Sequence, residues 1–139
     1  VWGAPLIVAQ ADVKAAHDWV QRNRHIDALL WKGIDPALIA AFHNGYVGVR
    51  STLEIPDGSV SAPFDINRGL RQGDPESSHH FSDILKHVMN DTVCTWQREG
   101  IGFKVPGNNV CINHTCIADN IILFASSPQQ MSDMLSDLS

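Results

Sequence analysis

The sequence has few cysteines, no long hydrophobic run and no signal segment. Its 139 residues contain three cysteines, an odd number, so we expect reduced thiols in an intracellular setting. No apolar run approaches the ~20 residues that a membrane-spanning helix needs. Residues 1–5 lack the charged and then apolar character of a signal peptide. The composition therefore predicts a protein that is neither exported nor inserted into a membrane.

Basic residues are too few for a protein that binds nucleic acid by itself. Ten Lys and Arg stand against 15 Asp and Glu, which gives a formal net charge of −5, whereas such a binder needs a basic surface. The length fits one globular domain. Because the sequence does not begin with Met, and because residues 131–139 form a helical pattern without a stop signal, we expect a fragment of a longer polypeptide.

Apolar spacing and turn residues predict one α+β unit in which helices alternate with short strands. Its first half contains a strand at residues 6–10, a helix at 15–31 ended by Gly33, a helix that begins at Asp35-Pro36 and stops near Asn44-Gly45, and a hairpin within 46–66 that turns at Pro56-Asp57-Gly58. Its second half contains a loop at 67–75, a long helix at 77–98, a turn at 106–109, a hairpin at 110–125 and a last helix from Ser127-Pro128.

Helical spacing also predicts which large side chains are buried. In the long helix these are Phe81, Leu85, Val88, Met89, Val93 and Trp96. The four tryptophans are expected in the core or at an interface: Trp2, Trp19, Trp31 and Trp96. His79 and His80, at the start of the long helix, are expected on the solvated surface.

One predicted hairpin places an acidic residue at the tip of an apolar scaffold. The segment Ile117-Ala118-Asp119-Asn120 separates the apolar runs 110–116 and 121–125, and a second acid, Asp12, follows the strand-like run 6–9. Carboxylate oxygens are preferred ligands of hard divalent cations. A metal site shared by two strand ends is one interpretation, and two unrelated acids that cap turns are the other.

Three segments together resemble a known family. Residues 12–18, Asp-Val-Lys-Ala-Ala-His-Asp, are similar to Asp-x-x-Lys-Ala-Phe-Asp. Residues 68–77, Arg-Gly-Leu-Arg-Gln-Gly-Asp-Pro-Glu-Ser, are similar to Arg-Gly-x-Arg-Gln-Gly-x-Pro-Leu-Ser, and residues 117–120 are similar to the Tyr/Phe-Ala-Asp-Asp box. In this order and spacing they resemble the reverse transcriptases of the non-LTR retrotransposon and group II intron type, over nearly the whole chain.

The resemblance implies a partial reverse transcriptase domain over residues 1–139. The implied fold is a polymerase palm-like antiparallel sheet packed with helices, with part of the fingers and without complete fingers and thumb. The implied activity is RNA-directed DNA synthesis, in which a primer 3′-hydroxyl attacks a deoxynucleoside triphosphate with the help of two Mg²⁺ ions, or of Mn²⁺ in their place. The implied partners are an RNA template, a DNA primer and the remaining fingers and thumb of the same polypeptide, with no membrane; nucleus and cytoplasm both stay open.

The resemblance also assigns roles to individual residues. Implied catalytic residues are Asp12, Asp119 and Asn120. Implied metal ligands are the carboxylates of Asp12 and Asp119 and the carbonyl of Val13. Implied nucleotide-binding and template-binding residues are Val13, His17, Arg71, Gln72 and Gly73.

Several positions depart from the family pattern. Asn120 stands where the family has a second acid, which should lower metal affinity. His17 replaces an aromatic residue that packs under the incoming sugar, which should weaken discrimination against ribonucleotides. Glu76, His79 and His80 also differ from the pattern. These changes keep a second interpretation open: a catalytically decayed or co-opted palm fragment that acts as a non-catalytic binding or interaction module.

Two further alternatives carry less support. An unrelated metal-dependent hydrolase would need a general base, for which His17 is the nearby candidate. A zinc site of Cys111, His114 and Cys116 lacks a fourth ligand at a suitable spacing. In every interpretation we expect the 139-residue chain by itself to have no polymerase activity.

Overall fold

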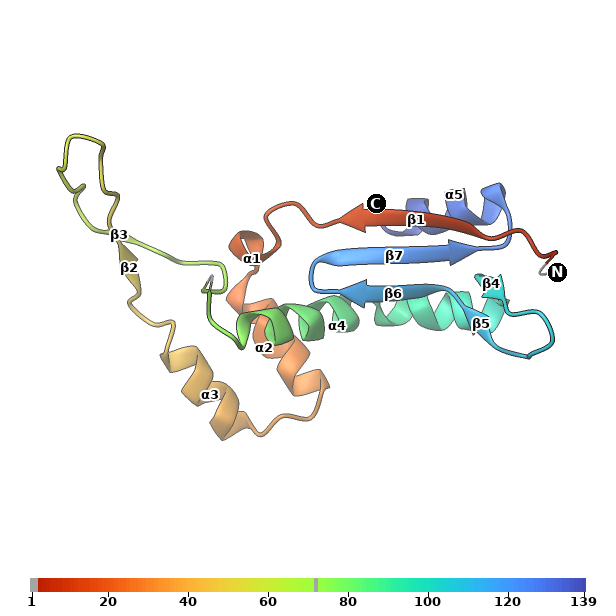
Figure 1. Ribbon diagram of the computed structural model, residues 1–139. Coiled ribbons are helices and arrows are strands. Elements are labelled where there is room, and N and C mark those ends of the chain that lie inside the picture. Colours follow the sequence, from red (N-terminus) through yellow and green to blue (C-terminus); the bar gives the residue numbers. More distant parts are fainter. Residues whose placement is uncertain (1–2, 72) are drawn as a thin grey trace. The chain divides into compact units, whose positions relative to one another are not determined.

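The computed structural model describes residues 3–71 and 73–139 (Figure 1), so the predicted site residue Gln72 and the tryptophan Trp2 lie outside the described residues. The chain divides into two compact units. One, the sheet unit, consists of Val1–Lys14 and Leu85–Ser139, and the other, the helical unit, consists of Ala15–Ile84. Helices and antiparallel strands alternate along the chain, which confirms the α+β fold class.

The sheet unit is built on a three-stranded antiparallel sheet in the order β1-β7-β6 (Figure 1). β1 is Ile7–Asp12, β6 is His114–Ile117 and the central β7 is Asn120–Ala125. Along β7, Ile121, Leu123 and Ala125 are buried and the residues between them are half-buried. This period of two buries one face of the sheet and leaves the other face open.

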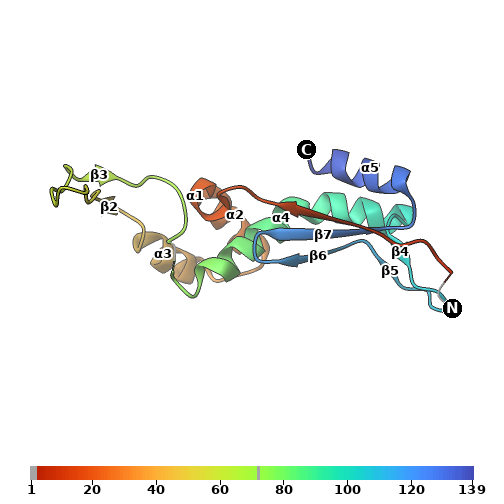
Figure 2. The ribbon, with the colours of Figure 1, turned by 45° about the horizontal axis from the view of Figure 1, so that its top comes forward.

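Two helices cover the buried face. They are α5, Pro128–Asp137, and the part of α4, Ser77–Glu99, that belongs to the sheet unit, and Figure 2 shows both running along the sheet. The indole N–H of Trp96 in α4 donates to Asp137 Oδ2 of α5 at 2.7 Å. The largest fully buried side chains among the described residues all belong to this unit: Trp96, Leu123 and Met134. None of the described helices combines the length and the apolar character that a bilayer crossing requires.

A second, shorter hairpin precedes β6. It pairs β4, Phe103–Lys104, with β5, Cys111–Ile112, around the turn predicted at 106–109. The sequence predicted one continuous apolar strand over 110–116. This prediction is wrong at Asn113, where the structure divides the segment into β5 and β6. The buried Asn113 side chain contacts His114 Nδ1 through Oδ1 at 2.8 Å, which satisfies the amide oxygen where the two strands part.

In the part of the helical unit that the structure describes there are four helical segments and a small hairpin. Its elements are α1 (Ala16–Trp19), α2 (Arg22–Trp31), α3 (Pro36–Asn44), β2 (Arg50–Ser51), β3 (Phe64–Asp65) and the first part of α4. The Asp35 carboxylate caps α3 by accepting from the Ala37 N–H at 2.7 Å, as predicted. The hairpin predicted around Pro56-Asp57-Gly58 is confirmed, although its paired strands are short.

The predicted continuous helix over 15–31 is wrong. Val20 and Gln21 are extended, with ψ of 120° and 124°, and they separate α1 from α2. The carbonyl of Val20 accepts a hydrogen bond from the Gly69 N–H at 2.8 Å, and the Val20 side chain is buried. A contact with a distant loop therefore overrides the local helical pattern.

Several burial predictions also fail. Trp96 is buried as expected, but Trp19 and Trp31 are 61% and 50% exposed, and Val88 on α4 is 66% exposed. His80, expected on the surface, is only 9% exposed. Its ring lies edge-on to His25 at 4.5 Å and to Phe42 at 5.1 Å, because α2 and α3 pack on that side of α4. His79 is exposed as predicted.

Candidate metal-binding and nucleotide-binding site

The strand that ends at Asp12 lies beside the hairpin that carries Asp119. Asp12 is the register partner of Asn120, the first residue of β7. One residue further, the Val13 N–H donates to the Asp119 carbonyl at 3.2 Å. Both acids therefore sit at adjoining strand ends within the sheet unit. The structure brings together four residues that the resemblance assigned to the site: Asp12, Val13, Asp119 and Asn120.

The turn between β6 and β7 holds Asp119 in a strained hairpin. The partners Ile117 and Asn120 close around Ala118 and Asp119, and Ala118 has a φ of 54°. Among the described residues, Ala15 is the other non-glycine residue with positive φ, at 51°. A left-handed alanine costs about 1–2 kcal/mol, and such strain concentrates at functional sites. One strained alanine thus lies near each acid: Ala118 directly precedes Asp119, and Ala15 follows Asp12 by three residues.

The open face of the sheet carries a polar contact that the sequence pattern did not reveal. The Gln10 amide donates to Asn120 Oδ1 at 2.6 Å. Gln10 precedes Asp12 by one strand period, so both point to the open face together with Asn120. A polar residue in an otherwise apolar strand, in phase with the acid, is the signal that could have identified Gln10.

The donor set at the strand ends fits a hard cation. Oxygen atoms that could bind such a cation stand at these strand ends: the carboxylates of Asp12 and Asp119 and the carbonyl of Val13. Within residues 3–71 and 73–139 no group of three or more His, Cys, Asp and Glu side chains is arranged to hold a metal. Mg²⁺ is commonly held by one or two carboxylates together with substrate phosphates, so this donor set suits Mg²⁺ that arrives with a nucleotide.

The cysteine and histidine residues near the sheet have other roles. The Cys111 thiol donates to the carbonyls of Gly100 and Ile101, at 3.9 and 3.7 Å. Burial lowers the pKa of His114 and raises the pKa of the Cys116 thiol, the latter against the attraction of Lys86. The Cys111 thiol is thus engaged with backbone carbonyls, and the Cys116 thiol is kept in its neutral form.

In the helical unit, backbone hydrogen bonds join residues 17–20 to the loop that contains Gly69. The N–H groups of Gly69 and Leu70 donate to the carbonyls of Val20 and His17, both at 2.8 Å. Gly69 has a φ of +88°, and a Cβ at this position would meet the His17 carbonyl oxygen at 3.1 Å. The loop therefore satisfies carbonyls at the end of the short helix α1, and only glycine fits this close approach.

Replacing Gly69 by alanine should destabilise this junction. We expect Gly69→Ala to lower the free energy of unfolding by about 2–4 kcal/mol, because it adds a steric contact to a backbone strain of about 1–2 kcal/mol. Gly58→Ala is the matched control, since Gly58 has a φ of +84° and open space around a Cβ. Urea denaturation measures both variants, and equal losses would contradict the close-approach argument.

Two of the predicted nucleotide-binding residues share a pocket. His17 and Gly73 line a space of about 260 Å³ together with Asp74, Ser77 and Ser78. The His17 ring stacks on Phe81, with ring centroids 5.5 Å apart and an interplanar angle of 29°. The imidazole therefore packs as an aromatic ring against Phe81.

Arg71 does not join this pocket. Its guanidinium donates to the Gly45 carbonyl and lies over the Tyr46 ring, 5.3 Å from the centroid. The Arg71 carbonyl accepts from Ser77 Oγ at 2.6 Å, which ties the loop to the start of α4. Arg71 thus lines a different and larger pocket of the helical unit.

An antiparallel sheet with helices on one face, an open second face and two aspartates at adjoining strand ends defines a palm-like fold. No protein-family model matches the sequence. The chain is 30% identical over 128 residues to the retrovirus-related Pol polyprotein from the type-2 retrotransposable element R2DM of Drosophila melanogaster, which covers 92% of this chain and 11% of that protein. A solved structure of telomerase from Candida albicans, in complex with a fragment of telomeric RNA, matches with a TM-score of 0.66 and 14% identity, over 97% of this chain and 25% of that one.

These similarities support a reverse transcriptase domain, as the resemblance of the three segments predicts. The telomerase likeness shows the fold, and the identity to the retrotransposon protein shows the relationship. The chain spans about 11% of the length of that relative, so the activity of a whole enzyme is left to be proposed.

Proposed function

We propose that this chain forms the palm of a retroelement reverse transcriptase and serves RNA-directed DNA synthesis within a longer polypeptide. The observation that carries the proposal is the junction of β1 with the hairpin of Asp119, made by the Val13 to Asp119 hydrogen bond of 3.2 Å. This junction would allow two acids that are far apart in the sequence to bind the same ion. The relative in Drosophila is a Pol polyprotein of a retrotransposable element, which agrees with this class of activity.

The carboxylates of Asp12 and Asp119 and the carbonyl of Val13 would hold the divalent ions. Bound Mg²⁺ would supply charge stabilisation for the attacking primer hydroxyl and the leaving phosphate. Asn120 contributes no charge, and its oxygen accepts from Gln10 at 2.6 Å. In this proposal Asp12 and Asp119 bind the ions, and the amide pair of Gln10 and Asn120 fixes the face on which Asp12 lies.

The pocket of His17 and Gly73 would receive the nucleotide sugar. Phe81 supports the His17 ring from one side, and Ser77 fixes the neighbouring loop through the Arg71 carbonyl. An imidazole leaves more room and more polarity than a phenyl ring, which favours relaxed discrimination against ribonucleotides. Template and primer grip would come from fingers and thumb elsewhere in the same polypeptide, so the 139-residue chain alone should not extend a primer.

The second candidate is a decayed or co-opted palm that acts as a non-catalytic module. The Gln10 to Asn120 hydrogen bond favours it, since a neutral amide pair stands where the family pattern has a second acid. The two candidates differ in one property: a working palm must bind divalent ions at Asp12 and Asp119, and a decayed palm need not.

Manganese-induced broadening of NMR signals tests the proposal. In the ¹⁵N-labelled chain with a deoxynucleoside triphosphate, we expect substoichiometric Mn²⁺ to broaden the amide signals of Val13 and Asp119 first, because relaxation depends steeply on distance from the ion. Excess Mg²⁺ should reverse the effect, and Asp12→Asn should abolish it. Asp133→Asn, an exposed acid on α5 that accepts from Gln129, is the control and should leave it intact. No broadening at these residues would favour the decayed module.

A further inference from the structure

A small cavity lies in the helical unit where α2 packs against α3. Its volume is about 10 Å³, which is room for about one water molecule. Apolar side chains form much of its lining, among them Leu29, Ile39 and Phe42. Two side chains from the first turns of α2, Arg22 and His25, line the same cavity. Nitrogen-bearing groups therefore border a space that is otherwise largely apolar.

Each of these two side chains carries a buried nitrogen atom without a protein partner. Arg22 Nε and His25 Nε2 are closed off from solvent, and neither has a hydrogen-bond partner among the described residues. His25 as a whole is only 5% exposed. The great majority of buried polar groups in proteins are paired, either with protein atoms or with ordered water. Two such nitrogens on side chains that line one cavity therefore indicate a bound ligand.

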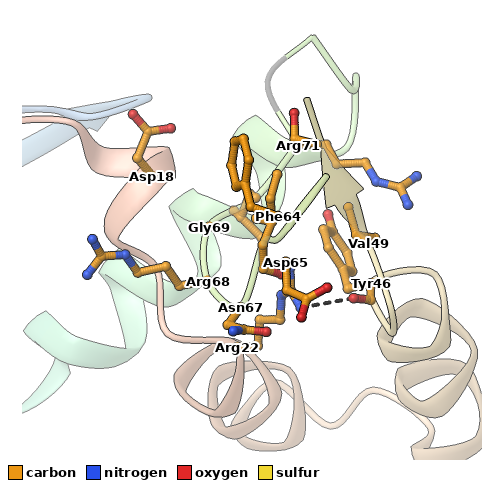
Figure 3. A pocket seen from close by; sticks show the side chains of 13 residues that line it. Asp18, Arg22, Tyr46, Val49, Phe64, Asp65, Asn67, Arg68, Gly69 and Arg71 are labelled. Carbon is orange, nitrogen blue, oxygen red and sulfur yellow. Dashed lines mark hydrogen bonds between the residues drawn. The ribbon is translucent and has the colours of Figure 1, made fainter. Parts of the chain in front are cut away.

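Other contacts hold both side chains in place. Arg22 and His25 are three residues apart on α2, so their side chains are neighbours on one face of the helix. Arg22 donates through Nη1 to the Tyr46 carbonyl at 2.9 Å and through Nη2 to the Ile66 carbonyl at 2.7 Å, and Figure 3 shows Arg22 close to Tyr46. The His25 ring lies edge-on to His80 at 4.5 Å. Because both side chains are already engaged, a partner has to come to the two nitrogens.

The chemistry of the two nitrogens selects the ligand. The Nε–H of arginine can only donate a hydrogen bond, and an unprotonated imidazole nitrogen can only accept one. Burial lowers the pKa of His25 to about 4, so its imidazole is neutral at pH 7. The ligand must therefore accept from Arg22, donate to His25 and fit the small cavity. A metal cation would be repelled by the guanidinium, and a simple anion has no proton to donate, whereas water meets every requirement.

We propose that this cavity binds one long-lived water molecule, which accepts a hydrogen bond from Arg22 Nε–H and donates one to His25 Nε2. The water completes the hydrogen bonding of Arg22, whose other nitrogens hold the carbonyls of Tyr46 and Ile66 at the two ends of the hairpin segment. It is thus a structural ligand that helps to fix the base of the hairpin on α2. The inference is independent of the proposed function, because neither Arg22 nor His25 has a role in the metal or nucleotide chemistry.

NMR contacts between water and the Nε–H proton of Arg22 test the site in the parent chain. In a ¹⁵N-resolved rotating-frame experiment we expect a dipolar cross-peak between this proton and water, with the sign opposite to that of chemical exchange. Arg24 is the matched control: it is an exposed arginine of the same helix that pairs with Asp27 at 3.8 Å and does not line the cavity. Its Nε–H should show exchange alone. Exchange alone at Arg22 as well would overturn the proposal.

Variants of His25 test the second hydrogen bond, with ¹⁷O relaxation dispersion as the count of long-lived water molecules. His25→Phe keeps a buried ring without the nitrogen and should hold one such water fewer than the parent chain. His25→Gln offers an amide oxygen as acceptor and should keep the parent count, as should His79→Phe at an exposed position of α4. An unchanged count in His25→Phe, or a lost water in His79→Phe, would overturn the proposal. If His25→Phe unfolds, the Arg22 contact in the parent chain still decides.

Discussion

Replacing Asn120 by aspartate is expected to raise the affinity of the chain for Mn²⁺ about tenfold. The new carboxylate would face Asp12, because Asp12 and Asn120 are register partners on neighbouring antiparallel strands. One extra unit charge about 6 Å from a divalent ion contributes about 1.4 kcal/mol in water, which corresponds to a factor of about ten. Electron paramagnetic resonance of free Mn²⁺ measures the change.

The control for this gain is Asn109→Asp, which adds the same charge in the exposed turn between β4 and β5. It should change the affinity less than twofold. The Asn120→Asp protein should also lose about 0.2–1 kcal/mol of stability without metal, since two like charges would then stand opposite each other. Equal affinities of Asn120→Asp and the parent chain would contradict the assignment of Asn120 to the metal site.

The free energy of unfolding is expected to fall by about 3 kcal/mol between pH 6.5 and pH 4 through His25 alone. Burial, with a smaller contribution from His80, lowers the pKa of His25 from 6.5 to about 4, and the attraction of Asp83 opposes this while His43 adds to it. The folded chain therefore binds fewer protons than the unfolded chain in this range. Stability is complete above about pH 6.5 and declines as the pH falls.

The structural reason is an unpartnered nitrogen in a cluster of rings. His25 Nε2 is buried and has no hydrogen-bond partner among the described residues. His80 lies edge-on at 4.5 Å, Glu76 lies 3.7 Å from His80, and Lys32 pairs with Asp83 at 2.6 Å nearby on the same helices. A proton on His25 Nε2 would have no hydrogen-bond acceptor among the described residues, so burial favours the neutral imidazole.

His25→Phe tests this origin, since it keeps a buried ring and removes the titration. Its unfolding free energy, measured with urea, should lose most of the decline between pH 6.5 and pH 4. His79→Phe removes an exposed imidazole from the neighbouring α4 and should retain the full decline. A decline in His25→Phe as steep as in the parent chain would assign the effect to other groups.

Local signals predicted where helices begin and where the acids stand. Asp35 and Ser127 cap α3 and α5 through their side chains, because capping needs only the residue and the next turn of backbone. The resemblance to reverse transcriptases implied that the strand ending at Asp12 lies beside the hairpin of Asp119, and the register of Asp12 with Asn120 agrees with it.

What the sequence could not predict depends on distant partners. The break at Val20 exists because the Gly69 N–H takes its carbonyl, and no residue near Val20 announces that contact. His80 is buried because α2 and α3 supply His25 and Phe42 around it. Trp19 does not pack into the core. Its ring instead lies against the Arg68 guanidinium at the surface, and most of the side chain stays exposed. His80 is therefore buried and Trp19 is exposed for one reason: the residues that contact them are distant in the sequence.

The central claim is that Asp12 and Asp119 hold the same ion, and a double-mutant cycle of Mn²⁺ affinity tests it most directly. The variants are Asp12→Asn, Asp119→Asn and the combination, measured by electron paramagnetic resonance with the triphosphate present. We predict that each single substitution removes nearly all the specific affinity and that the double substitution removes little more, since groups that act on one ion are not additive. Losses that add independently would contradict a shared ion and with it the palm assignment of these acids.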